Sequence, residues 1–230
     1  PLYHKLTLEK DGQRIWKEKF KHLEQVEISK LWYYSDGLKI NGHIIRPKKK
    51  GDYPCIIFNR GGNKAFGKFE STHMAFFLGE LAASGFIIVA SNYRGDGESE
   101  GQDEFGGKDV NDIINLFEIL PEIEGVDTSK VGMYGWSRGG MMTYIALSKL
   151  KGIKAAVIGG GVSNHFETLK DRPGMEAVMQ ELIPNYEQQK TKELEKRSAV
   201  YFANQLSKET PILIVHGSSD WRVKSTQAYQ

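Results

Sequence analysis

The feature that most constrains the fold is a series of short, unbroken apolar runs separated by segments with helical spacing. The expected strands are residues 54–59, 86–90, 131–135, 154–158 and 211–215, and the expected helices are residues 70–83, 110–120 and 139–150. Continuous apolar runs of this length are typical of strands buried on both faces. Their alternation with helices predicts an α/β fold, with a mostly parallel sheet covered by helices on both faces.

The beginning of the chain departs from this alternation. Residues 26–34 are rich in β-branched and aromatic side chains, and residues 38–46 place apolar residues on one face. These two segments predict antiparallel strands joined by a turn at Asp36-Gly37. Residues 1–25 are expected to form an N-terminal extension with one amphipathic helix. The apolar face of that helix would contain Ile15, Trp16, Phe20 and Leu23.

A second departure is the segment 164–208, which is polar, charged and helical in pattern, with no strand. It is either a helical cap inserted into a catalytic domain of residues 26–230 or a set of ordinary connecting helices. Asp109, just before the expected helix 110–120, is predicted to cap it.

Composition excludes several classes of protein and site. With 40% hydrophobic and 26% charged residues, the 230-residue chain is an ordinary globular sequence. The single cysteine, Cys55, excludes a disulfide framework and a cysteine-based zinc site. Histidines and carboxylates show no metal-ligand spacing, so neither a metal nor an organic cofactor is expected. No apolar run approaches the ~20 residues of a membrane span. Residues 1–11 lack a signal-peptide core, so a cytoplasmic protein is expected.

The net charge is only +2, but the first 50 residues hold 12 Lys or Arg against 6 Asp or Glu. The surplus is densest at residues 46–50. A phosphate-binding patch and a solvated loop both fit this pattern. The loop is favoured, and no nucleic-acid partner is expected, because no aromatic interleaving or nucleic-acid motif accompanies the charge.

The strongest catalytic signal is G-x-S-x-G at residues 135–139, which follows an expected strand and opens an expected helix. A sharp strand-to-helix turn requires small neighbours, which Gly135 and Gly139 provide. Such a turn would present the hydroxyl of Ser137 at the carboxyl end of the sheet, where ligands bind in open α/β folds. The alternative is a serine that caps the helix.

Two other loops fall where a hydrolase needs them. Asp220 follows the strand 211–215, in the place of the acid in the chain order Ser, Asp, His; the alternative is an Asp that caps its own loop. The loop 59–63 is glycine-rich and follows the strand 54–59. Its backbone N–H groups, with that of Arg138, could form an oxyanion hole. A phosphate cradle is the alternative, but the spacing G-x-x-x-x-G-K-[ST] is absent.

Taken together, segments 58–63, 92–95, 132–140 and 216–223 resemble the catalytic domain of the prolyl oligopeptidase family of serine peptidases, which has an α/β-hydrolase fold. The resemblance runs from about residue 26 to residue 230. It implies Ser137 as nucleophile and Asp220 as triad acid. It also implies an oxyanion hole and a substrate-binding surface. The residues implied for these are Arg138, Gly62, Gly61 and Arg60 for the oxyanion hole, and Arg222 and Trp136 for substrate binding.

Arg60 departs from the family pattern, because relatives commonly carry His or Tyr there. Backbone N–H groups are therefore favoured as oxyanion donors over the Arg60 side chain. In the polar loop 95–107, Asp103 and Glu104 could bind a substrate amine, although a solvated loop is the simpler interpretation.

The sequence contains six histidines, and none follows Asp220. His216 precedes the acid by four residues, and relatives carry this histidine without using it as the base. His165 would be an unorthodox base. The resemblance places the triad histidine further along, after one more strand and before a final helix. The last strand, the last helix and this histidine are therefore expected beyond residue 230, and the chain as given is expected to be inactive.

The expected function is a serine hydrolase that cleaves peptide or ester bonds in a small substrate through an acyl-enzyme on Ser137. Two alternatives remain open. One is a carboxylesterase without peptidase activity, and the other is a non-catalytic binding protein of the same fold.

Overall fold

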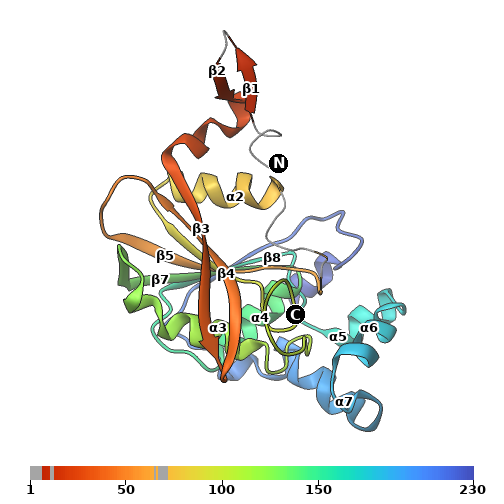
Figure 1. Ribbon diagram of the computed structural model, residues 1–230. Helices are drawn as coiled ribbons and strands as arrows, with labels where there is room; N and C mark the ends of the chain where they lie inside the picture. Colours follow the sequence, from red (N-terminus) through yellow and green to blue (C-terminus); the bar gives the residue numbers. More distant parts are fainter. Residues whose placement is uncertain (1–6, 11–12, 65, 67–71) are drawn as a thin grey trace.

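The computed structural model describes residues 7–10, 13–64, 66 and 72–230. In this part of the chain, a seven-stranded sheet has the order β3-β4-β6-β5-β7-β8-β9 (Figure 1). Its strands are β3 (Val26–Ser35), β4 (Leu38–Pro47), β5 (Tyr53–Asn59), β6 (Ile87–Ser91), β7 (Val126–Trp136), β8 (Ala155–Gly159) and β9 (Ile212–Val215). The strands β6, β5, β7, β8 and β9 run parallel, whereas β3 and β4 pair antiparallel.

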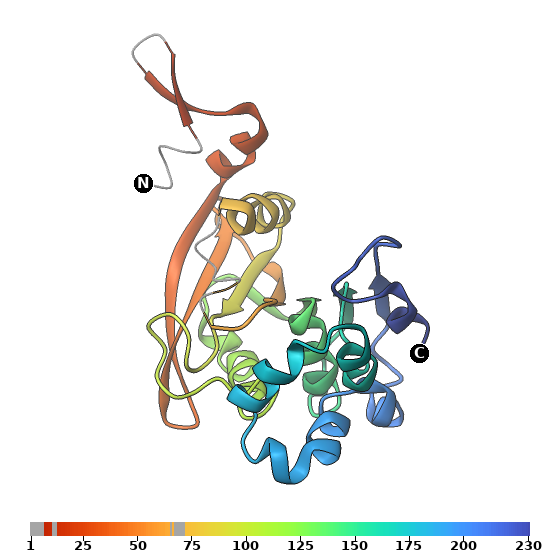
Figure 2. The same ribbon diagram turned by 90° about the vertical axis from the view of Figure 1, so that its right-hand side faces the viewer.

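Helices cover both faces of the sheet, as Figure 2 shows. On one face lie α2 (Thr72–Ala83) and the 3₁₀ helix η1 (Glu18–Gln25); on the other lie α3 (Val110–Glu118) and α4 (Arg138–Leu147). Adjacent residues of one strand contribute to different cores. Phe58 packs in the cluster that contains Leu78 of α2, and Ile57 packs in the cluster that contains Leu116 of α3. Side chains alternate between the faces of a strand, so the central strands are buried on both sides, as their unbroken apolar runs predict. The edge strand β9 is the exception, because Leu213, Ile214 and Val215 are exposed.

The antiparallel turn also forms where the sequence predicts it. Ser35 pairs with Leu38, which leaves Asp36 and Gly37 as the two-residue connection, and their φ angles are +51° and +79°. Positive φ at both positions defines the hairpin turn for which Asp-Gly is preferred. Residues 70 and 71 of the expected helix 70–83 lie outside the described residues.

The prediction of one amphipathic helix within residues 1–25 is wrong. A hairpin of β1 (Thr7–Lys10) and β2 (Gln13–Trp16) extends from the sheet (Figure 1), and among the described residues of this extension η1 alone is helical. Ile15 lies opposite Leu8 across the hairpin, so it is not on a helical face. η1 buries Phe20 and Leu23. Residues 1–6 and 11–12 of this extension lie outside the described part.

Segment 164–208 is helical, as expected. It contains α5 (His165–Asp171), α6 (Met175–Leu182) and α7 (Tyr186–Lys196), followed by the short 3₁₀ turns η3 (Ala199–Tyr201) and η4 (Ala203–Gln205). These helices share a small core of their own, centred on Met179 and Leu194 and closed by Phe105. Two further 3₁₀ segments are η2 (Leu120–Glu122) and η5 (Ser225–Tyr229). Of the helices in the described part, none is long and apolar enough to cross a membrane.

Candidate active site

Ser137 occupies a strained turn between β7 and α4. Its φ is +55° and its ψ is −120°, a conformation that non-glycine residues rarely adopt and that clusters at functional sites. Its N–H donates to the Gly159 carbonyl at 2.8 Å, and its own carbonyl accepts from Gly140 N–H at 2.8 Å. Its side chain makes no capping hydrogen bond to α4. This geometry does not fit the alternative of a helix-capping serine.

The turn brings the backbone of residues 135–139 close to the end of β5, so it requires residues without a Cβ atom. A Cβ atom on Gly139 would overlap the Asn59 carbonyl oxygen and lie 2.8 Å from the Arg60 carbonyl oxygen. A Cβ atom on Gly135 would overlap the Gly139 carbonyl oxygen. Asn59 Nδ2 also donates to Thr143 Oγ1 of α4 at 2.7 Å. The two glycines therefore give the clearance that the G-x-S-x-G pattern predicts.

The glycine loop, residues 60–63, lies directly beside the serine. A Cβ atom on Gly61 would be 3.1 Å from Ser137 Cβ and 3.0 Å from the Trp136 carbonyl oxygen. The Gly61 carbonyl accepts from Arg60 Nη1 at 3.1 Å, and the Gly62 carbonyl accepts from Arg138 Nη1 at 3.0 Å. A trans peptide directs its C=O and N–H in opposite directions. The N–H groups of Gly62 and Asn63 therefore point away from the two buried guanidinium groups.

The Arg60 side chain, by contrast, is turned into the protein. It is 0% exposed, and its Nη2 pairs with Asp96 and donates to the Asn92 carbonyl at 2.9 Å. Burial lowers the pKa of Arg60, while Asp96 opposes the shift. The guanidinium group has no exposed nitrogen for a substrate oxygen, so the Arg60 side chain is not placed to act as an oxyanion donor, and backbone N–H groups of the glycine loop stay the predicted donors.

Asp220 lies at the end of the neighbouring strands. Its Oδ1 accepts from Arg222 N–H at 2.9 Å and Val223 N–H at 3.0 Å. A Cβ atom on Gly160, which follows β8, would lie 3.2 Å from Asp220 Oδ2. Ser137 N–H bonds to Gly159, so the serine and the carboxylate border two successive residues at the end of β8. Parallel strands are about 4.8 Å apart, so β7 and β9 are separated by about 10 Å. This distance leaves room for an imidazole ring that hydrogen-bonds to both the serine and the carboxylate.

None of the histidines whose side chains are described lies where it could serve as the base. His216 Nε2 donates to the Val223 carbonyl at 2.7 Å and is 3.8 Å from Asp220 Oδ2, beyond hydrogen-bonding distance. His165 is 1% exposed, with Nε2 2.9 Å from Met141 Sδ, and burial lowers its pKa to about 3. His22 forms a hydrogen bond with the Phe76 carbonyl of α2. His43 lies on β4, which is separated from β7 by β6 and β5 in the sheet. His4 and the side chain of His73 lie outside the described part.

Large aromatic side chains are exposed at the last residue of β7 and in the segments that follow β5 and β9. Phe66 is 64% exposed, Trp136 50% and Trp221 71%. The guanidinium carbon of Arg222 is 5.6 Å from the Phe66 ring centroid and 5.1 Å from that of Trp221. Arg222 thus links the loop after β9 to Phe66, in the segment after β5. Substrate binding by Arg222 and Trp136 stays a prediction.

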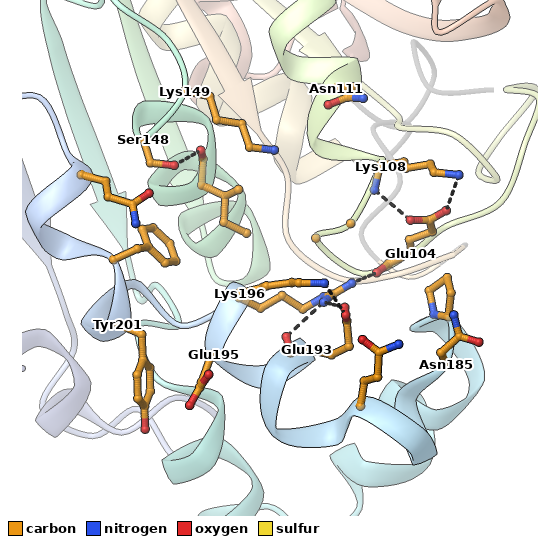
Figure 3. Close-up of a pocket in the computed structure, with 18 residues that line it drawn as sticks. Glu104, Lys108, Asn111, Ser148, Lys149, Asn185, Glu193, Glu195, Lys196 and Tyr201 are labelled. Carbon is orange, nitrogen blue, oxygen red and sulfur yellow. Dashed lines mark hydrogen bonds and ion pairs between the residues drawn. The ribbon is translucent and has the colours of Figure 1, made fainter.

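A cavity of about 920 Å³ lies elsewhere (Figure 3). It is lined by residues 104, 106–108 and 111, the end of α4 and residues of segment 184–205, and the side chains of Lys149 and Lys196 border it. Ser137 precedes α4, whereas Lys149 follows it, so about 18 Å of helix axis separates them at 1.5 Å per residue. Of the residues that the resemblance implies for catalysis, the oxyanion hole or substrate binding, none lines this cavity; Glu104, the other candidate for an amine site, does.

Sequence reasoning missed two buried carboxylates, Asp103 and Asp109, that pair with Arg138 next to the serine turn. Asp109 makes no capping hydrogen bond to α3, so its predicted capping role is wrong. It accepts instead from Gly106 N–H at 3.0 Å and pairs with Arg138. Asp103 is 7% exposed and also pairs with Arg138, so it lies in neither a solvated loop nor an open amine site. Within the described residues, no group of three or more His, Cys, Asp or Glu could hold a metal ion.

Comparison with known proteins agrees with this geometry. A family model described as the prolyl oligopeptidase family matches residues 71–230. The chain is 28% identical to the uncharacterized peptidase YtmA of Bacillus subtilis over 90% of this chain and 78% of that protein. It is 27% identical to the putative esterase YitV of the same organism, over 77% of this chain and 73% of that protein.

Among solved structures, the acylaminoacyl peptidase of Pyrococcus horikoshii superposes with a TM-score of 0.74 at 26% identity. The superposition covers 95% of this chain but only 37% of that peptidase. The strained serine turn, the glycine loop beside it and the match over residues 71–230 lead to one assignment: this chain has the α/β-hydrolase fold and belongs to the prolyl oligopeptidase family.

Proposed function

We propose that this protein is a serine hydrolase that cleaves peptide or ester bonds in small substrates through an acyl-enzyme on Ser137. The observation that carries the proposal is the position of Ser137. It lies in a turn with φ of +55°, with Gly61 packed against its Cβ and with Asp220 next to the adjoining Gly160. This is the arrangement that nucleophilic acyl transfer requires: a nucleophile, oxyanion donors beside it and an acid that orients the base.

In the proposed reaction, Ser137 Oγ attacks the substrate carbonyl carbon while a base removes its proton. The carbonyl oxygen becomes an oxyanion that accepts from Arg138 N–H and from an N–H of the glycine loop. The intermediate collapses, the bond to the amine or alcohol breaks, and the protonated base returns its proton to that leaving group. Water then attacks the acyl-enzyme by the same route and releases the acid and free Ser137.

Asp220 would act on the base rather than on the substrate. Its carboxylate holds an imidazole in one tautomer and stabilises the imidazolium. Asp220 is held by two backbone N–H groups on Oδ1, while its Oδ2 faces the end of β8. Oδ2 therefore lies beside the end of β8, between the ends of β7 and β9. In the proposed mechanism the imidazole of the base occupies this position.

The base in this proposal is a histidine carried by a segment that pairs with the outer edge of β9. No strand among the described residues lies on that side of β9. Leu213, Ile214 and Val215 are 59%, 42% and 50% exposed there, whereas such an edge is normally covered.

The substrate could be a peptide or an ester, and the relatives include both named peptidases and a putative esterase. The two activities are separated by comparing turnover of an aminoacyl anilide with that of a simple acyl ester. A peptidase turns over both, whereas a carboxylesterase turns over only the ester.

The proposal is tested with a fluorophosphonate probe on the protein expressed from its complete gene, with Ser137→Ala as the control. Labelling that requires Ser137 supports the hydrolase. Equal labelling of both proteins, or none of either, contradicts it, and the second result favours a non-catalytic binding protein of the same fold.

A further inference from the structure

Arg138 directly follows the nucleophile, and its side chain is fixed inside the protein. It is 3% exposed and lies between the rings of Tyr93 and Phe105, with its guanidinium carbon 5.6 and 4.8 Å from their centroids. Both Nη atoms bond to the Asp103 carboxylate, at 2.7 and 2.6 Å, and Nη2 also pairs with Asp109. Bidentate Arg–carboxylate pairs of this kind fix direction as well as charge.

The charges of this cluster are mutually dependent. Burial works against the charge of Arg138, but Asp109 and Asp103 outweigh it and raise the pKa of Arg138. Burial likewise opposes the charge of Asp103, but Arg138 holds the pKa of that carboxyl below its usual value. Arg138 and Asp103 therefore both remain charged, and their two-point pairing holds the guanidinium group in one orientation.

In that orientation, Nη1 of Arg138 points toward the glycine loop. Nη1 donates to the Gly62 carbonyl at 3.0 Å. The same residue thus has two connections to the oxyanion site: its backbone N–H follows Ser137, and its side chain holds the facing loop. Arg60 adds a second anchor from Nη1 to the Gly61 carbonyl at 3.1 Å.

Resting on the proposed function, we infer that the Arg138 side chain is a positioning residue. Through Asp103 and Asp109, it fixes the Gly62 peptide group relative to Ser137, so that the N–H groups of the glycine loop meet the developing oxyanion. The side chain itself does not touch the substrate. Misplacement of about 1 Å in a catalytic constellation can lower the rate about 10²-fold, so this orientation bears directly on kcat.

The test uses Arg138→Lys in the full-length protein. Lysine keeps the positive charge and the backbone N–H, but it cannot hold both carboxylates and the Gly62 carbonyl with one planar group. The matched control is Arg94→Lys. Arg94 is 4% exposed, and its Nη2 and Nε bond to Asp112 at 2.7 and 3.2 Å, but it makes no contact with the glycine loop.

Both variants are assayed for kcat and KM per active site, with sites counted by fluorophosphonate titration. The expected result for Arg138→Lys is a kcat lower by about 10- to 100-fold with little change in KM, as for an interaction made in the transition state. Affinity for a boronate that forms a tetrahedral adduct should fall in parallel. Arg94→Lys should lower only the melting temperature.

Equal kcat per site in the two variants would overturn the inference while leaving the proposed function intact. Absence of labelling in the wild type would instead reject the proposed function. If Arg138→Lys does not fold, Asp103→Asn replaces it. The asparagine keeps one acceptor for Arg138, so a smaller fall in kcat is expected, and an unchanged kcat again contradicts the inference.

Discussion

Replacing Gly139 by alanine tests the packing that builds the turn around Ser137. In an exposed helix, this change would stabilise the protein by about 0.5–1 kcal/mol, because glycine loses more backbone entropy on folding. Here the new Cβ would overlap the Asn59 carbonyl oxygen and lie 2.8 Å from the Arg60 carbonyl oxygen. Both neighbours are backbone atoms, so β5 or α4 must move. Overpacking of this kind costs about 1–3 kcal/mol, and the upper end applies because no flexible side chain can yield.

The net expectation is a loss of about 2 kcal/mol in unfolding free energy, which lowers the melting temperature by about 4–8 °C in a chain of this size. Thermal unfolding followed by circular dichroism measures it. Gly174→Ala is the matched control, because its φ is −62° and its added Cβ would have no atom within 4 Å. The reasoning is refuted if the two variants melt at the same temperature.

Three further predictions follow from buried groups. Arg60→Met removes the guanidinium that pairs with the buried Asp96 and should cost about 3–5 kcal/mol in urea unfolding; a loss below 1 kcal/mol would contradict the burial of this pair. His165 is neutral when folded, with a pKa of about 3, and takes up a proton on unfolding below its ordinary value of about 6.5. Stability should therefore fall with pH by about 1.4 kcal/mol per unit below pH 6.5, and His165→Gln should remove that part of the slope. An identical slope in this variant would contradict the prediction. Burial raises the pKa of Cys55 to about 12, so Ellman's reagent should react with it only after unfolding; rapid reaction of the native protein would contradict this.

The parallel sheet was predictable from sequence because its strands are buried on both faces, and their apolar runs, such as residues 86–90, are therefore unbroken. The N-terminal hairpin was not predicted, although Asp11-Gly12 between its strands is a typical hairpin signal. The spacing of Ile15, Trp16, Phe20 and Leu23 suggested a helix instead. A segment this short fits both the helical repeat of 3.6 residues and the strand repeat of two. Pairing between residues 7–10 and 13–16 is what makes it a hairpin.

At the site, the serine turn could be predicted because its geometry requires glycines at fixed positions. The roles of Asp103 and Asp109 could not, because a buried carboxylate and a solvated one look alike in sequence. What distinguishes them is the guanidinium of Arg138, which comes from the first turn of α4. Asp96 and Arg60 form a second pair of this kind.

The most direct test of the account is a crystal structure of the full-length protein after reaction with a fluorophosphonate. The account predicts phosphorus bonded to Ser137 Oγ, with one phosphonyl oxygen within about 2.7–3.1 Å of Arg138 N–H and of an N–H of the glycine loop. A phosphonyl oxygen directed away from both loops, or phosphorus on another residue, would contradict it.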